Sequence, residues 1–136
     1  VQKAKVLYQW PYTRQLIRCA WSPNGAWVVT SSEDFSLQRW GVGAYQAAAA
    51  NASSPPPVPT PTAMQSHDSW VFALAWSPDS QTCFSGGYDG RLIRWDMTGE
   101  TPIVTHRVDA HSGWIRGVAV SPDGTKLASC GNDLRI

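Results

Sequence analysis

A short turn motif that occurs three times constrains this sequence most. It reads SPNG from Ser22, SPDS from Ser77 and SPDG from Ser121, so the motifs start 55 and 44 residues apart. Proline presets φ at the second position of such a turn, and Asn, Asp and Gly favour the positions that follow. Three of these turns in a chain of 136 residues indicate a repeated unit rather than one irregular domain.

Other residues recur at fixed distances from this turn. His67 and His111 each lie ten residues before the Ser of their turn, whereas the same position in the first unit is Tyr12. A hydroxyl residue precedes an Asp by four positions in every unit, and a Trp follows that Asp after six in the two complete units. These residues are Thr30, Asp34 and Trp40, then Ser85, Asp89 and Trp95, then Ser129 and Asp133.

Between these landmarks the chain reads as short strands. Val71, Leu74 and Trp76 alternate with other residues except for one slip, as a β-bulge between Val71 and Leu74 would produce. Strands are expected over 15–21, 26–31 and 35–40, over 81–86, 91–96 and 101–107, and over 114–120 and 125–130. A further strand is expected over residues 5–10.

The shared spacing of His, the Ser-Pro turn, Ser or Thr, Asp and the closing Trp-Asp resembles the WD40 repeat. That resemblance implies an all-β, WD40-type β-propeller segment, with two complete blades and a truncated third of four-stranded antiparallel sheets. In this register residues 1–11 are the outer strand of a preceding blade, 12–66 the first repeat, 67–110 the second and 111–136 the third, truncated repeat. Since a propeller typically needs about four to eight blades, we expect a fragment that packs against the remaining blades of a longer protein.

One insertion breaks the period. Trp40 lies 27 residues before His67, whereas Trp95 lies 16 before His111, and the extra residues fall in an Ala/Pro-rich segment over 43–62. Low complexity and several prolines predict a solvated loop in an outer hairpin. A proline-rich docking site is the sharper alternative. Asn51 starts a glycosylation sequon, which has meaning only in a secreted protein.

Charge and cysteine content narrow the class of protein. With 11 basic and 10 acidic residues and a net charge of +1, the chain gives no electrostatic reason to expect nucleic acid or a membrane as partner. The three cysteines, Cys19, Cys83 and Cys130, fall on predicted strands and are expected to be small buried thiols. Unpaired thiols favour a reducing compartment, so a cytoplasmic location is expected.

Ser85, His67 and Asp89 have the composition of a hydrolase triad. The same set recurs as Ser129, His111 and Asp133, and a catalytic site copied in every unit is implausible. We therefore expect no enzyme activity.

The resemblance instead implies hydrogen-bonded structural networks, formed by His67, Ser85, Asp89 and Trp95, by His111, Ser129 and Asp133, and by Thr30, Asp34 and Trp40. The histidines His67, His106 and His111 show no metal-ligand spacing, so neither a metal nor another cofactor is predicted.

The resemblance also implies a partner-binding face where each first strand begins. The positions that project there are Gln15, Ile17 and Glu33, then Trp70, Phe72 and Tyr88, then Trp114, Arg116 and Asn132. Five of these nine are aromatic or Arg, the types enriched at binding hot spots. The alternative is that each Trp packs on its own loop. Arg39 and Arg94 are expected to extend to the rim of their blades.

These observations predict a non-catalytic scaffold for protein–protein interaction. The alternative is a regulatory or sensing propeller domain of a larger multidomain enzyme, of the kinase or hydrolase type. The two interpretations differ only in residues outside this sequence.

Overall fold

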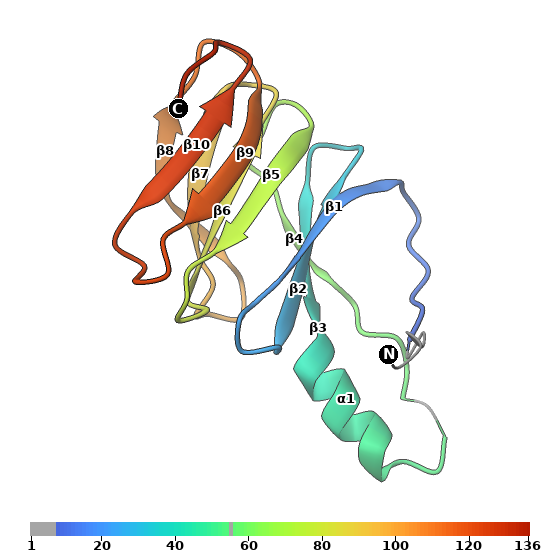
Figure 1. The fold of residues 1–136 in the computed structure, drawn as a ribbon. Coiled ribbons are helices and arrows are strands. Elements are labelled where there is room, and N and C mark those ends of the chain that lie inside the picture. Colours follow the sequence, from blue (N-terminus) through green and yellow to red (C-terminus); the bar gives the residue numbers. More distant parts are fainter. Residues whose placement is uncertain (1–7, 55) are drawn as a thin grey trace, which may run out of the picture.

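The computed structural model describes residues 8–54 and 56–136. Its antiparallel sheets lie side by side (Figure 1), each with its strands in chain order. The first sheet contains β1 (Leu16–Trp21), β2 (Trp27–Ser32), β3 (Leu37–Gly41) and β4 (Thr62–Met64). The second contains β5 (Val71–Trp76), β6 (Thr82–Gly87), β7 (Arg91–Asp96) and β8 (Ile103–Asp109), and the third contains β9 (Ile115–Val120) and β10 (Leu127–Gly131). The predicted four-stranded antiparallel sheets are confirmed.

The Ser-Pro turn joins the first two strands of each sheet. In the second sheet the Ser80 amide donates to the Ser77 carbonyl at 2.9 Å. The last turn residue has positive φ, which is 71° at Gly25, 72° at Gly124 and 62° at Ser80. A serine is strained there relative to glycine. Its hydroxyl, however, accepts a hydrogen bond from the Asn24 amide at 3.0 Å, so this turn is tied to the turn of the first sheet.

The bulge predicted in the second unit is confirmed. Where β5 pairs with β6, the register shifts between Val71 and Ala73, and β1 shifts in the same way between Leu16 and Arg18. A bulge leaves one residue unpaired and bends the strand. In β5 the unpaired residue is Phe72, near the start of the strand. The first strands of the three sheets, β1, β5 and β9, lie next to one another there.

The main core lies between the first and second sheets. Its buried side chains are Val29, Leu37 and Met64 from the first sheet and Val71, Trp76, Cys83, Ile93, Trp95 and Met97 from the second sheet and the residue after it. Ile115 is fully buried between the second and third sheets. A Cβ atom on Gly86 would lie 2.5 Å from the Ile115 side chain, so only glycine allows β6 and β9 to approach this closely.

Contrary to the prediction, two of the three cysteines are exposed. Cys83 is fully buried in the core, and this burial raises the pKa of its thiol to about 12, whereas Cys19 and Cys130 are exposed. By repeat register Cys130 corresponds to Gly86, which faces the following sheet. Cys19 corresponds to Val118, which faces the preceding sheet. Both exposed thiols thus lie on the outer faces of the end sheets, where the described residues provide no further sheet to cover them.

The first part of the insertion is a helix, which corrects the expectation of a loop throughout 43–62. Helix α1 (Val42–Asn51) follows β3 directly and buries Val42 and Tyr45. Four consecutive alanines, the residue with the best helix propensity, lie ahead of the first proline of the insertion. No helix among the described residues is long and apolar enough to cross a bilayer.

The strand predicted over residues 5–10 lies partly outside the described residues, and the prediction is wrong for Tyr8 to Trp10, which are not in a strand. Their rings pack instead on the first sheet and on α1. Trp10 stacks on Trp40 with ring centroids 6.0 Å apart, and Tyr45 meets Trp10 edge-on at 5.0 Å. Among the described residues, no neighbouring sheet lies on this side to pair with the segment.

Deleting residues 47–57 tests whether the rest of the insertion is needed for folding. The deletion shortens the path from Trp40 to His67 to the 16 residues seen in the second unit and keeps the buried Tyr45. Because loop closure depends weakly on length, we expect the free energy of unfolding to change by less than about 1 kcal/mol. Thermal melting followed by circular dichroism measures this change. Loss of a cooperative transition would show that residues 47–57 are packed.

Arg39 does not extend into solvent as predicted. It is only 3% exposed, and its guanidinium donates to the carbonyls of Met97 at 3.1 Å and Gly99 at 2.9 Å, as well as to that of Glu100. The guanidinium also stacks over Trp27, with 4.3 Å from Cζ to the ring centroid. Its side chain therefore crosses from β3 to the segment after β7 and fastens the second sheet to the first. Arg94, in contrast, is exposed.

Candidate functional site

The second sheet contains a chain of polar contacts at one end of the core. Nδ1 of His67 lies 2.9 Å from Oδ2 of Asp89, and Nε2 lies 2.8 Å from Oγ of Ser85. Trp95 donates its indole N–H to the same Ser85 oxygen at 2.8 Å. The four residues named from the sequence are thus brought together in the order Asp, His, Ser, Trp.

The direction of each hydrogen bond follows from the protonation state of His67. Burial lowers the pKa of His67, although Asp89 opposes the shift, so the imidazole is neutral at pH 7. With Nδ1–H donating to the carboxylate, Nε2 accepts from the Ser85 hydroxyl, which in turn accepts from Trp95. The side chains of Asp89, His67, Ser85 and Trp95 thus all have hydrogen-bond partners. Since Ser85 is fully buried, its oxygen is closed to a substrate.

The other two units contain parts of this chain. In the third, His111 lies 2.8 Å from Asp133 and 2.9 Å from Ser129, and the hydrogen bond from His111 lowers the pKa of Asp133. In the first, Trp40 donates to Thr30 at 2.9 Å.

The carboxylate of the first unit has different neighbours. Asp34 has no histidine beside it, because that position holds Tyr12, and it forms an ion pair with Arg14 at 3.2 Å instead. The aromatic side chain of Tyr12 packs edge-on against Trp40, with ring centroids 5.5 Å apart.

Metal-ligating residues are scattered rather than grouped. In the part of the chain that the structure describes, no three or more His, Cys, Asp or Glu side chains are placed to hold an ion. His106, the histidine outside the polar chains, is exposed on β8.

A partly exposed cluster of aromatic rings lies where the first strands of the second and third sheets begin. Tyr88 is stacked between Phe72 and Trp114, with ring centroids 4.6 and 4.2 Å apart and interplanar angles of 13° and 8°. Trp70 packs against Tyr88 at 6.1 Å. Trp70 and Trp114 stay 45% and 42% exposed. The four rings, which come from two adjacent sheets, therefore form one continuous surface.

Arg116 and Asn132 complete this surface. The guanidinium of Arg116 lies beside the stacked rings of Trp114 and Tyr88, with Cζ 5.0 and 5.4 Å from the two ring centroids. Its Nε donates to Oδ1 of Asn132 at 2.7 Å, and a terminal nitrogen donates to the Tyr88 hydroxyl at 3.2 Å. We call the six residues Trp70, Phe72, Tyr88, Trp114, Arg116 and Asn132 the aromatic–arginine surface.

The three positions named in the first unit lie at its margin. Trp70 donates its indole N–H to the carbonyl of Glu33 at 3.1 Å, so the backbone of Glu33 adjoins the surface. Gln15 is exposed and accepts the Glu33 amide through its carbonyl at 3.0 Å. Ile17 is the half-buried bulge residue of β1 and corresponds to Phe72. The first unit thus adds no ring to the stack.

Arg18 belongs to this region but was missed by sequence reasoning. Its Nε donates to the Phe72 carbonyl at 3.1 Å, and its Cζ lies 5.9 Å from the centroid of the Phe72 ring. Counting positions from the Ser-Pro turn identified Ile17 as the residue that projects to this face. Arg18 is the next residue, directly after the bulge. A long cationic side chain on the strand next to β5 was the signal that could have identified it.

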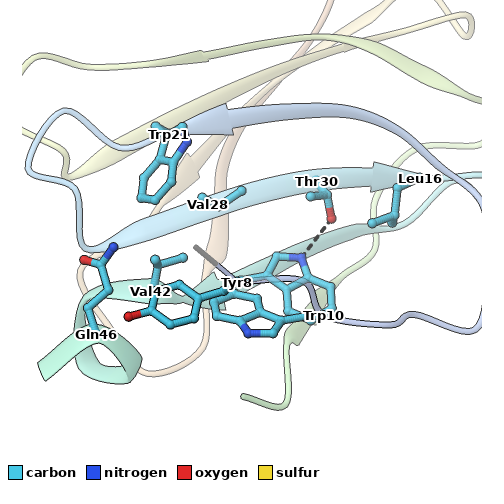
Figure 2. Close-up of a pocket in the computed structure, with 9 residues that line it drawn as sticks. Tyr8, Trp10, Leu16, Trp21, Val28, Thr30, Val42 and Gln46 are labelled. Carbon is cyan, nitrogen blue, oxygen red and sulfur yellow. Dashed lines mark hydrogen bonds between the residues drawn. The ribbon is translucent and has the colours of Figure 1, made fainter. Parts of the chain in front are cut away.

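An apolar pocket of about 420 Å³ lies on the outer face of the first sheet. Figure 2 shows the rings of Tyr8 and Trp10 along one side, with Val28 and Trp21 on the sheet opposite and Gln46 of α1 at the edge. The indole nitrogen of Trp10 is buried without a hydrogen-bond partner among the described residues. Apart from Tyr8, Thr30 and Gln46 the lining is apolar or Trp, so the pocket mainly offers an apolar packing surface.

Comparison with protein families gives three matches within this chain. The family model described as WD domain, G-beta repeat, matches residues 8–41, 59–96 and 102–136. Each matched range contains one Ser-Pro turn.

Curated relatives and solved structures agree with this match. Mouse and human striatin-4 are both 30% identical over 115 residues, covering 78% of this chain. Drosophila melanogaster actin-interacting protein 1 is 33% identical over 69 residues, covering 51% of the chain. The chain spans only 15% of striatin-4 and 11% of actin-interacting protein 1.

Among solved structures, a chain of the mitotic checkpoint complex superimposes with a TM-score of 0.71 at 21% identity. The match covers 92% of this chain and 33% of the other. The Myceliophteria thermophila Cps50 (Swd1) β-propeller domain gives a TM-score of 0.69 at 12% identity, covering 89% and 34%. At these identities the two structures establish the fold alone.

Proposed function

This chain belongs to the WD40-repeat family of β-propeller proteins, and from that premise we propose that it is a non-catalytic platform that binds a protein partner through the aromatic–arginine surface. The observation that carries the proposal is the stack of the half-buried Phe72 and Tyr88 with the exposed Trp114, which has the exposed Arg116 beside it. Tyr, Trp and Arg dominate binding hot spots. Because these side chains already hold one another in place, a partner immobilises few of them on binding.

A non-catalytic role is supported by the polar chains. The Ser of each His-Ser-Asp set is hydrogen-bonded to a histidine of its own sheet, and Ser85 is fully buried. A nucleophile must be open to its substrate and needs an oxyanion site beside it. A set that recurs in two sheets with its hydrogen bonds satisfied stabilises the fold instead.

The comparisons support a protein partner in a general way. One structural neighbour is a chain of the mitotic checkpoint complex, which is a multiprotein assembly by its description. Blades of a propeller pack face to face, and the pocket of Figure 2 leaves an apolar face on the first sheet. We assign this face to packing against another blade, and the aromatic–arginine surface to the partner.

Replacing both Trp70 and Trp114 by alanine should abolish partner capture while changing stability little. Both rings are more than two-fifths exposed, so the free energy of unfolding should fall by only about 1 kcal/mol. Affinity capture from cells of the source organism, followed by mass spectrometry, compares the variant with wild type.

The matched control is Ile103→Ala/Val108→Ala, because both side chains are more than half exposed on β8. Proteins held by wild type and by this control should be lost from Trp70→Ala/Trp114→Ala. Equal capture by all three proteins would contradict the assignment of the binding surface.

A further inference from the structure

Two arginines flank the aromatic stack. Arg18, from the first sheet, lies beside Phe72, and Arg116, from the third, lies beside Tyr88 and Trp114. Both are exposed. The stack is thus a rigid spacer that holds two cationic groups from two different sheets.

Neutral groups hold both guanidiniums in place. The Nε of Arg18 donates to a backbone carbonyl, and the Nε of Arg116 donates to an amide oxygen. Neither arginine forms an ion pair with a carboxylate among the described residues. Each guanidinium carries five N–H donors, so each keeps terminal donors that these contacts do not use.

Most carboxylates near this region already form ion pairs or hydrogen bonds with other residues. Asp34 pairs with Arg14. In the other two sheets Asp89 and Asp133 bind the histidines of their own polar chains. Glu33 remains as an exposed carboxylate at the margin of the surface. The charge presented beside the rings is therefore positive.

The same geometry argues against a cationic ligand. Aromatic rings attract a cation through their faces, but both faces of Tyr88 are covered by Phe72 and Trp114. Beside the stack, Arg18 and Arg116 already lie 5.9 and 5.0 Å from the ring centroids of Phe72 and Trp114. A second cation there would meet like charge.

Resting on the proposed function above, we propose that the partner segment that binds the aromatic–arginine surface is an acidic peptide, whose Asp or Glu carboxylates are bound by Arg18 and Arg116. A guanidinium and a carboxylate form paired, charge-assisted hydrogen bonds of defined geometry. The rings between the two arginines supply apolar contact for the side chains between the carboxylates.

Peptide selection on the full-length protein tests this proposal. Random peptides displayed on phage are selected on the wild type, on Arg18→Gln/Arg116→Gln, and on the control Arg94→Gln/Arg107→Gln, which removes equal charge from β7 and β8. Peptides from wild type and control should contain Asp and Glu at about twice the frequency of the unselected library. A representative synthetic peptide should bind Arg18→Gln/Arg116→Gln at least about tenfold more weakly in fluorescence anisotropy.

Two other outcomes separate this proposal from the proposed function. Peptides that lose binding to Trp70→Ala/Trp114→Ala, yet are not acidic or bind the Arg18→Gln/Arg116→Gln variant equally well, would overturn the acidic partner and leave the surface standing. Selected peptides that bind Trp70→Ala/Trp114→Ala as well as wild type would overturn both.

Discussion

Replacing Asp89 with alanine should lower the free energy of unfolding by roughly 1–3 kcal/mol, because buried donors lose their acceptor. The carboxylate accepts from the His67 ring at 2.9 Å and from the backbone amides of Asp68 and Arg91 at 3.0 Å each. Without it, the imidazole has no partner to hold its tautomer, and Ser85 and Trp95 lose the fixed neighbour that completes their chain. Such networks are strongly coupled when fully satisfied. Urea denaturation of the protein measures the loss.

Two variants sharpen this test. Asp133→Ala removes the equivalent carboxylate in the third sheet, where Ser129 is half-buried, unlike the fully buried Ser85. Its cost should therefore be smaller than that of Asp89→Ala, because the groups left unpaired are reached by water more easily. Asp89→Asn should also be destabilising, since an amide in place of the carboxylate turns an acceptor oxygen into a donor. An unchanged denaturation midpoint for Asp89→Ala would reject a stabilising role for the polar chain.

Arg39→Met is expected to lower the free energy of unfolding by a comparable amount, because it removes contacts between the first two sheets. Methionine keeps much of the apolar stem but donates no hydrogen bond, so the carbonyl of the buried Met97 loses its partner. The stacking on Trp27 is lost as well. Hydrogen bonds to a charged group are worth about 1.5–3 kcal/mol, and we expect a loss in this range. Thermal and urea denaturation both report it.

Arg14→Met is the matched control. Arg14 is also an arginine of the first sheet region, but its side chain is 54% exposed and forms a surface ion pair with Asp34. Surface pairs of this kind contribute about 0–1 kcal/mol. If Arg39→Met cost no more than Arg14→Met, the contacts of Arg39 with the second sheet would have no energetic weight.

Much of the architecture followed from spacing alone. The distances among the Ser-Pro turn, Asp89 and Trp95 reflect strand lengths and turn sizes, so they predict β5 to β7 within one or two residues. The slip in the alternation around Val71 identified the bulge because side chains of a strand alternate strictly otherwise. The residues that meet around Tyr88 also follow from this register, since equivalent positions of adjacent units lie at the same end of their sheets.

Contacts between sheets did not follow from spacing. The spacing of residues within a repeat does not show which side chain reaches the next repeat. The contacts of Arg18 and the burial of Arg39 were therefore missed. Helix α1 was missed because its alanines were averaged with the prolines that follow. For Cys19 and Cys130 the strand pattern gave the face of the sheet but not whether another sheet covers that face.

The joint between the first and second sheets has a consequence for how the chain folds during synthesis. Its hydrogen bonds connect residues far apart in sequence, with separations of 40 positions for Ser31 and Val71 and 58 for Arg39 and Met97. Contacts between such distant residues form slowly, because a long loop must close first. The inner face of the first sheet, with Val29 and Leu37 fully buried in the finished fold, stays bare until the second sheet has left the ribosome. During that interval the nascent chain exposes an apolar, aggregation-prone sheet face, which is the kind of surface that chaperones bind.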